Sequence, residues 1–448
     1  SNIDEKNEEL IIEKIESFFL LFISVVLIVT GVITFNLTFL QWIVFIPSVL
    51  MLIIAAVSLK KISEPIPYEK PPFVSMIIPA YNEEFTIEGT VRSIANMDYF
   101  DDEGNKNFEL IVCNDGSTDS TGEILDSLKD EFETLRIITR KPPQSGKGKG
   151  FVLNDALNLS HGEIVGVFDA DTRVKPDFLE KIIPYLNDPE VHGVQSRVKM
   201  YNKDENYLAR MQHVEFTCFA NTLRARDIMG FNGFLGGNGQ FIKKEAVNAV
   251  GKWDGFAVTE DLNISIKMLI NGYKIRFCGE VAIYQEAVTT WKALFKQRTR
   301  WATGNFEALF IYTPIILRSK LSILKKIGIM DHISFYAFNL FIFIGFVTFI
   351  VNMAAWFIFD MPTFIRMEAP LVIGVISAFA FFPPLIIALT RDKTNVKEFI
   401  KDLVGYWVYC YHLIPLFFKT MGSMFTRKER TWSKTEHVKT TVDVQIEE

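Results

Sequence analysis

Three long stretches without a charged residue constrain this chain more than any other feature of its sequence. They cover residues 17–59, 332–359 and 369–390, and are 43, 28 and 22 positions long. An α-helix needs about 20 apolar residues to cross the hydrocarbon of a bilayer. The first stretch is therefore long enough for two spans and each of the others for one. We expect an integral membrane protein with four spans, which excludes a soluble enzyme, a fibrous protein and a disordered chain.

Basic residues beside the apolar stretches predict the orientation. Residues 318–331 carry four basic residues against one acidic, and residues 391–402 carry four against three. Because cytoplasmic loops are rich in Lys and Arg, we expect both segments, both termini and the central polar region in the cytosol. The prediction is a multi-pass protein of the plasma membrane. Segment 403–418 is apolar but contains Pro415, and we expect it to be interfacial or re-entrant.

Charge and cysteine content narrow the class of protein further. The chain has 47 Lys and Arg against 53 Asp and Glu, a formal net charge of −6, so nothing indicates a nucleic-acid partner. Its four cysteines lie far apart, without the paired spacing of a metal site. They are expected to be reduced thiols of a cytosol-facing protein. These residues are Cys113, Cys218, Cys278 and Cys410.

The polar region between the apolar stretches alternates strand-like and helix-like segments. It begins with the proline-rich linker SEPIPYEKPP and ends near residue 303. Strand, helix and strand at these intervals predict a parallel sheet with crossover helices, a Rossmann-like layout. The strand-like runs are 74–80, 109–114, 135–140 and 163–171, and helix-like spacing occurs in 83–96 and 150–159.

Polar residues follow three of the predicted strands. Asp169 and Asp171 come directly after an apolar run, and a pair of carboxylates at the ligand-binding edge of a parallel sheet suits Mg²⁺ or Mn²⁺ with a diphosphate. The alternative is a solvated acidic turn. Segments 81–84 (YNEE) and 114–117 (NDGS) are turn sequences when taken alone. All three strand ends are expected to converge on one edge, which favours a site.

Three further motifs each permit a structural and a functional interpretation. Residues 146–150 (GKGKG) open a predicted helix, where glycines and lysines favour phosphate, although the motif taken alone favours a flexible basic turn. Residues 259–261 (TED) are either an N-cap with acids in the first turn or the position of a general base. Residues 297–301 (QRTRW) are either an interfacial anchor or a group that binds phosphate and stacks on a sugar.

The ordered set NDGS, DAD, TED and QRTRW resembles the processive family-2 glycosyltransferases, which include cellulose, poly-N-acetylglucosamine and hyaluronan synthases. The resemblance runs from about residue 74 to residue 301. It implies an α/β GT-A (Rossmann-like) cytosolic glycosyltransferase domain embedded between α-helical transmembrane segments. The expected domains are an N-terminal segment with two transmembrane helices (1–62), the glycosyltransferase domain (63–303), channel-forming helices (304–420) and a cytosolic tail (421–448).

The resemblance implies a donor site for a UDP-sugar. Tyr81, Glu83 and Asp115 would hold the uridine, and Lys149 would contact the diphosphate, with Lys147 as the reserve.

It also implies a catalytic centre. Asp169 and Asp171 would lie at the nucleotide and the metal, Asp171 being the direct ligand of Mg²⁺ or Mn²⁺. Asp261 would be the general base that deprotonates the acceptor hydroxyl, and Glu260 belongs to the same catalytic motif.

The resemblance also implies an acceptor site and a gating loop. Gln297 and Trp301 would bind the acceptor, and Arg300 would lie near the diphosphate. Trp432 and Thr435 resemble the tryptophan–threonine element of a gating loop that closes over UDP. Segment 230–241 has a different composition from the acceptor loops of the family, so no acceptor contacts are transferred to it.

The sequence therefore predicts a processive, inverting synthase that polymerises a UDP-sugar and secretes the product across the plasma membrane. UDP-glucose and a linear β-glucan are favoured, followed by UDP-N-acetylglucosamine and poly-β-N-acetylglucosamine. The expected partners are the UDP-sugar, the growing polysaccharide and the lipid bilayer, and an accessory subunit is compatible with this scheme. The competing hypotheses are a single-transfer lipid glycosyltransferase and a non-catalytic sensor of nucleotide sugars.

Overall fold

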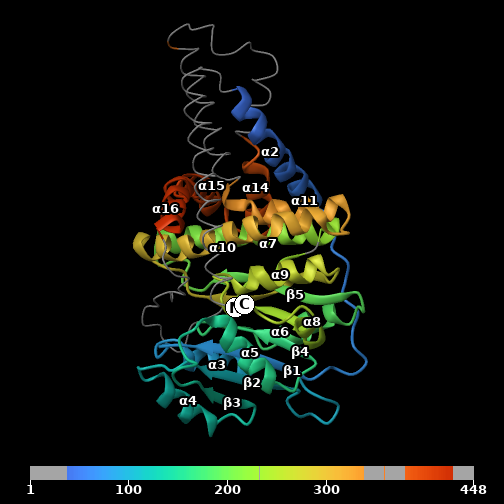
Figure 1. Ribbon diagram of the computed structural model, residues 1–448, viewed down its shortest axis with the longest axis vertical. Coiled ribbons are helices and arrows are strands. Elements are labelled where there is room, and N and C mark those ends of the chain that lie inside the picture. Colours follow the sequence, from blue (N-terminus) through green and yellow to red (C-terminus); the bar gives the residue numbers. More distant parts are fainter. Residues whose placement is uncertain (1–37, 232, 338–357, 359–378, 427–448) are drawn as a thin grey trace. The chain divides into compact units, whose positions relative to one another are not determined.

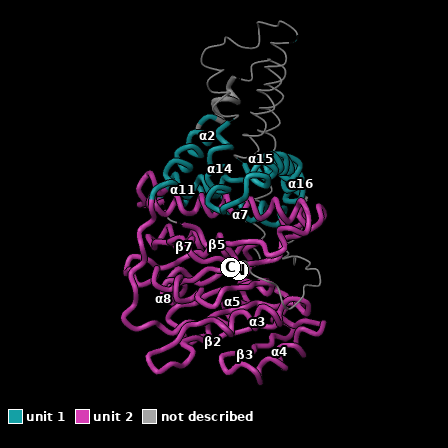
Figure 2. The backbone as a smooth tube through the Cα atoms, turned by 180° about the vertical axis from the view of Figure 1, so that it is seen from behind, with its two compact units in different colours: residues 1–60, 298–318, 326–429 teal, residues 61–297, 319–325, 430–448 magenta. Residues whose placement is uncertain are grey.

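The computed structural model describes residues 38–231, 233–337, 358 and 379–426 (Figure 1). The chain divides into two compact units, coloured separately in Figure 2. Unit 1, drawn in teal, contains 1–60, 298–318 and 326–429, and unit 2, drawn in magenta, contains Lys61–Gln297 with 319–325 and 430–448. Each unit is considered by itself.

A seven-stranded mixed sheet forms the centre of the Lys61–Gln297 unit, with the strand order β3-β2-β1-β4-β6-β5-β7. Strands β1 to β4 are parallel to one another, and β6 runs antiparallel to both of its neighbours. β5 and β7 are again parallel. The strands are β1 (Val74–Ala80), β2 (Phe108–Asn114), β3 (Leu135–Thr139), β4 (Ile164–Val167), β5 (Val191–Met200), β6 (Gln240–Lys243) and β7 (Lys274–Gln285).

Helices connect these strands as the hydrophobic spacing predicts. In α3 (Ile87–Ala95) the buried residues Ile87, Val91 and Ile94 recur at helical spacing and face the sheet core. The remaining helices of this unit are α4 (Thr121–Lys129), α5 (Lys149–Leu159), α6 (Phe178–Ile182), the 3₁₀ turn η1 (Ile183–Leu186), α7 (Tyr207–Met229), α8 (Lys244–Ala249) and α9 (Glu260–Ile270).

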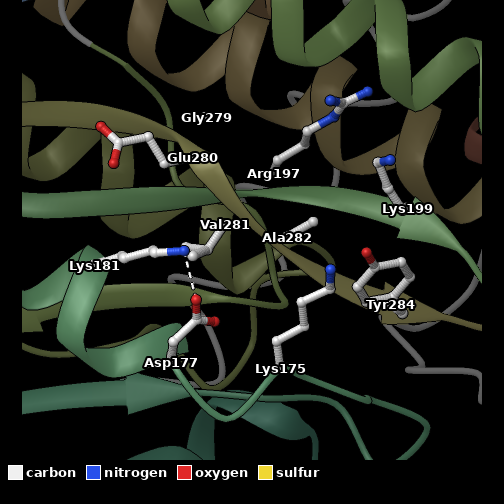
Figure 3. A pocket seen from close by; sticks show the side chains of 10 residues that line it. All are labelled: Lys175, Asp177, Lys181, Arg197, Lys199, Gly279, Glu280, Val281, Ala282 and Tyr284. Carbon is white, nitrogen blue, oxygen red and sulfur yellow. Dashed lines mark hydrogen bonds and ion pairs between the residues drawn. The ribbon is translucent and has the colours of Figure 1, made fainter. Parts of the chain in front are cut away.

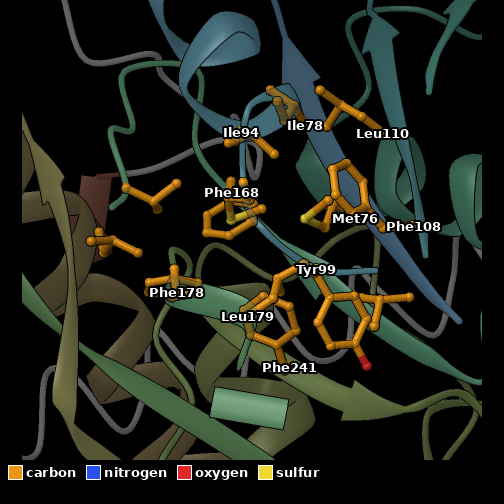
Figure 4. Close-up of a cluster of buried hydrophobic side chains, with 14 of the residues drawn as sticks. Met76, Ile78, Ile94, Tyr99, Phe108, Leu110, Phe168, Phe178, Leu179 and Phe241 are labelled. Carbon is orange, nitrogen blue, oxygen red and sulfur yellow. The ribbon is translucent and has the colours of Figure 1, made fainter. Parts of the chain in front are cut away.

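The main hydrophobic core lies against the central strands and is closed by aromatic rings. Phe168, Phe178 and Phe241 are fully buried, with ring centroids 5.6–5.9 Å apart (Figure 4). Gly166 makes this packing possible, because a Cβ atom there would lie 2.4 Å from the ring of Phe241. Close packing of this kind holds β4 rigidly, and the acidic segment 169–171 directly follows that strand.

The sheet agrees with the sequence prediction in its first half and differs in its second. All four predicted strands are present, and β1 has the predicted bounds of 74–80. The prediction of a wholly parallel sheet is wrong, because β6 inserts antiparallel between β4 and β5. The sequence of β6, QFIK, has a polar residue at each end and only two apolar residues, so it does not form the apolar run that identifies β4 (IVGV).

The described part of unit 1 is helical. It contains α2 (Thr38–Ser58), most of α10 (Trp291–Arg318), most of α11 (Ile323–Ile333), α14 (Phe382–Arg391), α15 (Val396–Cys410) and α16 (Leu413–Thr426). Phe306 on α10 packs against Phe417 on α16, with ring centroids 5.6 Å apart. The apolar segment 403–418 is therefore not a single helix, since α15 ends at Cys410 and α16 begins at Leu413.

Within the described ranges, no helix is both long enough and apolar enough to cross a bilayer. Parts of the predicted spans fall elsewhere, because residues 1–37, 338–357 and 359–378 lie outside the described part of the chain, whereas residues 38–59 and 379–390 lie within it. The four predicted spans and their orientation stay predictions.

Candidate active site

Loops after β1 and β2 are bonded to each other at the carboxyl edge of the sheet. The backbone N–H of Asn82 donates to Oγ of Ser117 at 2.9 Å, and Oδ1 of Asn82 accepts from the backbone N–H of Thr118 at 2.8 Å. Asn82 adopts a positive φ of 54°, which Asn tolerates better than most residues. The predicted convergence of these two strand ends on one edge is thus confirmed in the fold.

The two residues predicted to hold a uridine after β1 differ in exposure. Tyr81 is 37% exposed, so its ring is accessible. Glu83 is tied to the neighbouring loop, because its backbone N–H donates to Oγ1 of Thr121 at 2.8 Å. Its Oε2 also accepts a hydrogen bond from Oγ1 of Thr86 at 3.3 Å.

Asp115, at the end of β2, is buried and fixed from two sides. Its carboxylate accepts hydrogen bonds from Nη1 of Arg140 and from the backbone N–H of Gly146, the latter at 3.1 Å. Burial raises the pKa of the Asp115 carboxyl above its usual value, although Gly146 and Arg140 oppose this shift. The contact with Gly146 links Asp115 to the glycine–lysine loop 146–150, so two motifs predicted to bind one nucleotide lie side by side.

The acidic pair after β4 is held by a residue from a distant loop. Oδ1 of Asn238 accepts the backbone N–H of Asp169 at 3.1 Å and the hydroxyl of Thr172 at 2.9 Å. Oδ2 of Asp171, which is 6% exposed, accepts the backbone N–H of Glu286 at 3.1 Å. The backbone of Asp169 and the carboxylate of Asp171 are thereby held at the edge where β1 and β2 also end.

Lys149 is the centre of this arrangement. Its ammonium donates to Oδ1 of Asp169 at 2.7 Å and to the carbonyl of Gly237 at 3.1 Å, and it lies 3.3 Å from Oε1 of Glu260. Burial alone would lower the pKa of Lys149, but the charges of Asp169, Glu260 and Asp261 raise it above the ordinary value. Lys149 therefore stays charged at neutral pH and can face a diphosphate.

Glu260 and Asp261 begin helix α9. Thr259 occupies the N-cap position and both acids lie in the first turn, as the structural interpretation of this motif predicts, although the Thr259 side chain makes no capping hydrogen bond. Glu260 is 4% exposed and pairs with Lys149, whereas Asp261 is less buried. A Cβ atom at Gly237 would lie 3.2 Å from Nζ of Lys149 and 3.3 Å from Oδ2 of Asp261. Glycine at this position leaves room for both charged groups, and a larger residue would require them to shift by a few tenths of an ångström.

The QRTRW motif lies on helix α10. Gln297, Arg300 and Trp301 are spaced three and four positions apart, so they share one helix face. The guanidinium of Arg298, which is fully buried, lies 4.0 Å from the centroid of the Trp301 ring. One face of the predicted sugar-stacking ring is therefore against Arg298. Gln297 belongs to one compact unit, and Arg300 and Trp301 belong to the other.

The predicted gating residues Trp432 and Thr435 lie outside the described residues.

Asp169 and Asp171 are suited to a divalent cation without forming a complete protein site. Among the described residues, no group of three or more His, Cys, Asp or Glu side chains could hold a metal ion. Mg²⁺ commonly takes only one or two carboxylates, with phosphate oxygens and water completing its shell. Two fixed carboxylates beside a lysine that can face a diphosphate fit that mode of binding.

The candidate active site also contains three residues that the sequence did not identify: Asn238, Gly237 and Gln285. Asn238 is 5% exposed and also donates from Nδ2 to Oε1 of Gln285 at 3.0 Å. The signal was present in GGNGQF, since glycines on either side of an Asn are typical of close backbone approach. The resemblance assigns no role to segment 230–241, so the sequence alone does not identify Asn238 as a site residue.

Comparison with known proteins identifies the family. The sequence model of the glycosyltransferase-like family 2 matches residues 71–304. The chain belongs to this family. The match confirms that the chain is a glycosyltransferase, and it covers the predicted strands and the DAD and TED motifs.

Two curated relatives and one solved structure show the range of similar proteins. The β-monoglucosyldiacylglycerol synthase of Nostoc sp. is 34% identical over 57% of this chain and 53% of its own length. The poly-β-1,6-N-acetyl-D-glucosamine synthase of Staphylococcus aureus is 29% identical over 53% of this chain and 55% of its own length. The chain thus spans about half the length of both relatives.

A solved mannosyltransferase from Pyrobaculum calidifontis, in complex with GDP-Man and Mn²⁺, has a TM-score of 0.56 and 22% identity. The similarity covers 83% of this chain and 99% of the mannosyltransferase. At this identity it supports the GT-A fold alone.

Proposed function

We propose that this family-2 glycosyltransferase is an inverting hexosyltransferase that uses a UDP-sugar donor at the membrane. The observation that carries the proposal is the convergence of Lys149, Asp169, Glu260 and Asp261 around Gly237. A permanent cation there can face the donor diphosphate, and a less buried carboxylate on the same edge is available to the acceptor. The names of both curated relatives are in keeping with a hexose or an N-acetylhexosamine as the transferred sugar.

The chemistry proposed is a single displacement. The acceptor hydroxyl gives its proton to the carboxylate of Asp261 while its oxygen forms a bond to C1 of the donor sugar. The bond between C1 and the diphosphate oxygen breaks, and UDP departs with the bonding electrons. Because attack comes from the face opposite the leaving group, an α-linked donor gives a β-linked product.

Separate residues would bind the diphosphate, the uridine and the metal ion. Lys149 would contact the diphosphate, where its charge stabilises departing UDP, and Glu260 would keep that ammonium in position. Asp115 and Tyr81 would contact the uridine. Asp169 and Asp171 are the residues that would hold Mg²⁺ or Mn²⁺, which would supply further positive charge against the leaving group. The Mn²⁺ named for the mannosyltransferase of the same fold is in keeping with this.

The proposal has two forms, which differ in the acceptor: a growing polysaccharide or a lipid. The QRTRW motif on α10 favours a growing polysaccharide, with Gln297, Arg300 and Trp301 on the acceptor side and a linear β-glucan as the product. The similarity to β-monoglucosyldiacylglycerol synthases instead favours a single transfer to a lipid. The uncharged stretches 17–59, 332–359 and 369–390 would anchor either form in the plasma membrane, with the glycosyltransferase domain in the cytosol.

One assay tests the donor and separates the acceptors. The full chain in lipid vesicles is supplied separately with radiolabelled UDP-glucose and UDP-N-acetylglucosamine, together with Mn²⁺ and diacylglycerol. Label retained in high-molecular-weight product supports polysaccharide synthesis and names the sugar. Label that moves with lipid supports the single-transfer form. If neither donor is consumed, and neither is hydrolysed to UDP, the proposed function is wrong.

A further inference from the structure

Helix α3 contacts two parts of the candidate active site. At its start, the backbone N–H of Ile87 donates to the carbonyl of Glu83, one of the residues expected at the uridine, at 3.0 Å. In the middle of the helix, Oγ1 of Thr90 donates to the carbonyl of Ala170 at 2.6 Å. Ala170 is the central residue of the DAD motif. The helix therefore reaches the acidic turn between its two carboxylates.

The hydroxyl of Thr90 makes the contact with this turn. A threonine within a helix commonly donates to the carbonyl four residues earlier, which here is that of Thr86 at 3.1 Å. The carbonyl of Ala170 is closer, at 2.6 Å, and is the main acceptor of the single hydroxyl proton. The oxygen also accepts a hydrogen bond of 3.0 Å from Nη1 of Arg173. Thr90 is fully buried, so water does not reach these bonds to replace them.

Arg173, at the end of the acidic turn, is a buried cation packed against a glycine. It is 3% exposed, and its Nη1 donates to the carbonyl of Thr172 at 3.0 Å as well as to Thr90. Its guanidinium lies against Gly89 of α3, where a Cβ atom would be 2.0 Å from Nη2. Burying a cation is costly without such partners, and glycine within a helix is unfavourable. Their combination here indicates that the packing fixes the place of the guanidinium.

Strand β7 holds the same segment through the backbone. The N–H of Arg173 donates to the carbonyl of Tyr284, and the N–H of Tyr284 donates to the carbonyl of Arg173, both at 2.8 Å. The N–H of Glu286, just after β7, donates to Oδ2 of Asp171 at 3.1 Å. The chain continues beside β7, since Lys175 and Tyr284 line one pocket (Figure 3). Arg173 thus bonds to β7 through its backbone and to α3 through its side chain.

We propose that Thr90 and Arg173 are positioning residues for the divalent cation. Thr90 would fix the carbonyl between the two carboxylates, and Arg173 would hold the end of the turn against α3, so that Asp169 and Asp171 can share one ion. Neither residue would touch the ion or the substrate. Residues that support metal ligands in this way tune the affinity for the metal. The inference rests on the proposed function, because it concerns the metal site assigned there.

Thermal unfolding of the full chain in neutral detergent tests this role without an activity readout. Mn²⁺ is titrated at a fixed concentration of UDP, and the midpoint of unfolding is recorded. A cation that binds only the folded protein raises this midpoint in a concentration-dependent way. The midpoint without Mn²⁺ reports the stability of each variant, and the rise with Mn²⁺ reports its affinity for the ion.

Two substitutions of Thr90 separate the hydroxyl from the shape of the side chain. Thr90→Val keeps the shape and removes the hydroxyl, and we expect it to need about tenfold more Mn²⁺ than wild type for half of the full rise. Thr90→Ser keeps the hydroxyl and should lie close to wild type. Thr217→Val is the matched control, because its buried hydroxyl donates to the carbonyl of His213 within helix α7. It should show the Mn²⁺ requirement of the wild type.

Gly89→Ala changes the turn through Arg173 alone. The added methyl group would displace the guanidinium, so we expect a higher Mn²⁺ requirement, as in Thr90→Val. Alanine favours a helix more than glycine does. A loss of Mn²⁺ affinity in this variant would therefore not come from a weaker α3.

The Mn²⁺ requirements of the variants decide the proposal. If Thr90→Val and Gly89→Ala both match the wild type, the positioning role is wrong even where their stability is lower, and the proposed function stands. A shift in one variant alone overturns the role of the other residue, Arg173 in the case of Gly89→Ala. An equal shift in Thr217→Val overturns both roles. If Mn²⁺ does not raise the wild-type midpoint, the metal site of the proposed function fails together with this inference.

Discussion

Lys149 donates a hydrogen bond of 2.7 Å to Oδ1 of Asp169, which ties the start of helix α5 to the turn after strand β4. The same ammonium lies 3.3 Å from Glu260 at the start of α9. Three segments far apart in the sequence are thus joined by one cation. In the proposed reaction this cation would exchange part of its contact with the carboxylates for contact with the donor diphosphate.

Replacing Lys149 by Met should weaken both folding and donor binding. Asp169 and Glu260 would lose their shared counterion, and breaking a buried ion pair costs roughly 3–5 kcal/mol. Urea unfolding measures the first effect, and calorimetry with UDP measures the second. Lys129→Met, at an exposed position on α4, is the control. Unchanged stability together with unchanged UDP affinity would contradict the role given to Lys149.

Asn238→Ala should disturb the acidic turn without touching its carboxylates. The backbone N–H of Asp169 and the hydroxyl of Thr172 would lose their acceptor. Leaving buried donors unsatisfied costs about 1–3 kcal/mol, and we expect the metal concentration for half-maximal transfer to rise. A titration of the transfer rate with Mn²⁺ measures this.

The matched control for Asn238 is Asn96→Ala, an exposed Asn whose side chain bonds only within its own helix end. It should leave the Mn²⁺ dependence unchanged. A normal Mn²⁺ dependence in Asn238→Ala would show that Asn238 acts on folding alone.

Removal of divalent cations should stop transfer. Asp169 and Asp171 are both fixed at the sheet edge, and Asp171→Asn removes one of the two negative charges proposed to hold the ion. EDTA should abolish the rate in the wild type, and added Mn²⁺ or Mg²⁺ should restore it. Asp171→Asn should need a higher cation concentration. A rate that is insensitive to EDTA would rule out the metal role of this pair.

Glu109, at the opposite edge of the sheet, should make stability depend on acidic pH. Burial opposes its ionisation, but hydrogen bonds from Ser75, from the backbone of His161 and from Arg136 together lower the pKa of Glu109 below the usual 4.5. A carboxylate with a lowered folded-state pKa stabilises the protein above its unfolded pKa. This stabilisation is lost as the pH falls through the folded value.

The free energy of unfolding checks this, measured at pH 7 and in steps below pH 4.5 for the wild type and Glu109→Gln. We expect the variant to be less stable at pH 7 and the difference to shrink as the pH falls. Glu123→Gln, an exposed position on α4, should track the wild type throughout. A difference that stays constant with pH would mean that Glu109 contributes only packing.

The first half of the sheet was predictable because its strands are buried on both faces. Val74–Ala80 reads as a continuous apolar run for this reason, and the acids that follow such runs mark the ligand edge. β6 and Asn238 were not predictable in the same way. β6 reads QFIK, with a polar residue at each end, and lacks the apolar run of β4. The contact between Asn238 and Asp169 joins residues 69 positions apart.

The contacts within the site also could not be predicted from the sequence. The motif TED suggested either a cap or a base, and the position of Thr259 at the N-cap of α9, with Glu260 and Asp261 in the first turn, is compatible with both. The QRTRW motif gave no sign that Arg298 covers one face of Trp301. The role of each motif depends on which side chains contact it in the folded protein, and the spacing of residues along the chain does not predict those contacts.

Asp261→Asn tests the assignment of Asp261 as the general base. The substitution keeps the shape of the side chain and removes its ability to accept a proton, so transfer from the UDP-sugar should fall about 10²–10⁴-fold while UDP affinity stays close to wild type. Asp126→Asn, at an exposed position on α4, should transfer normally. Full transfer by Asp261→Asn would show that Asp261 is not the general base.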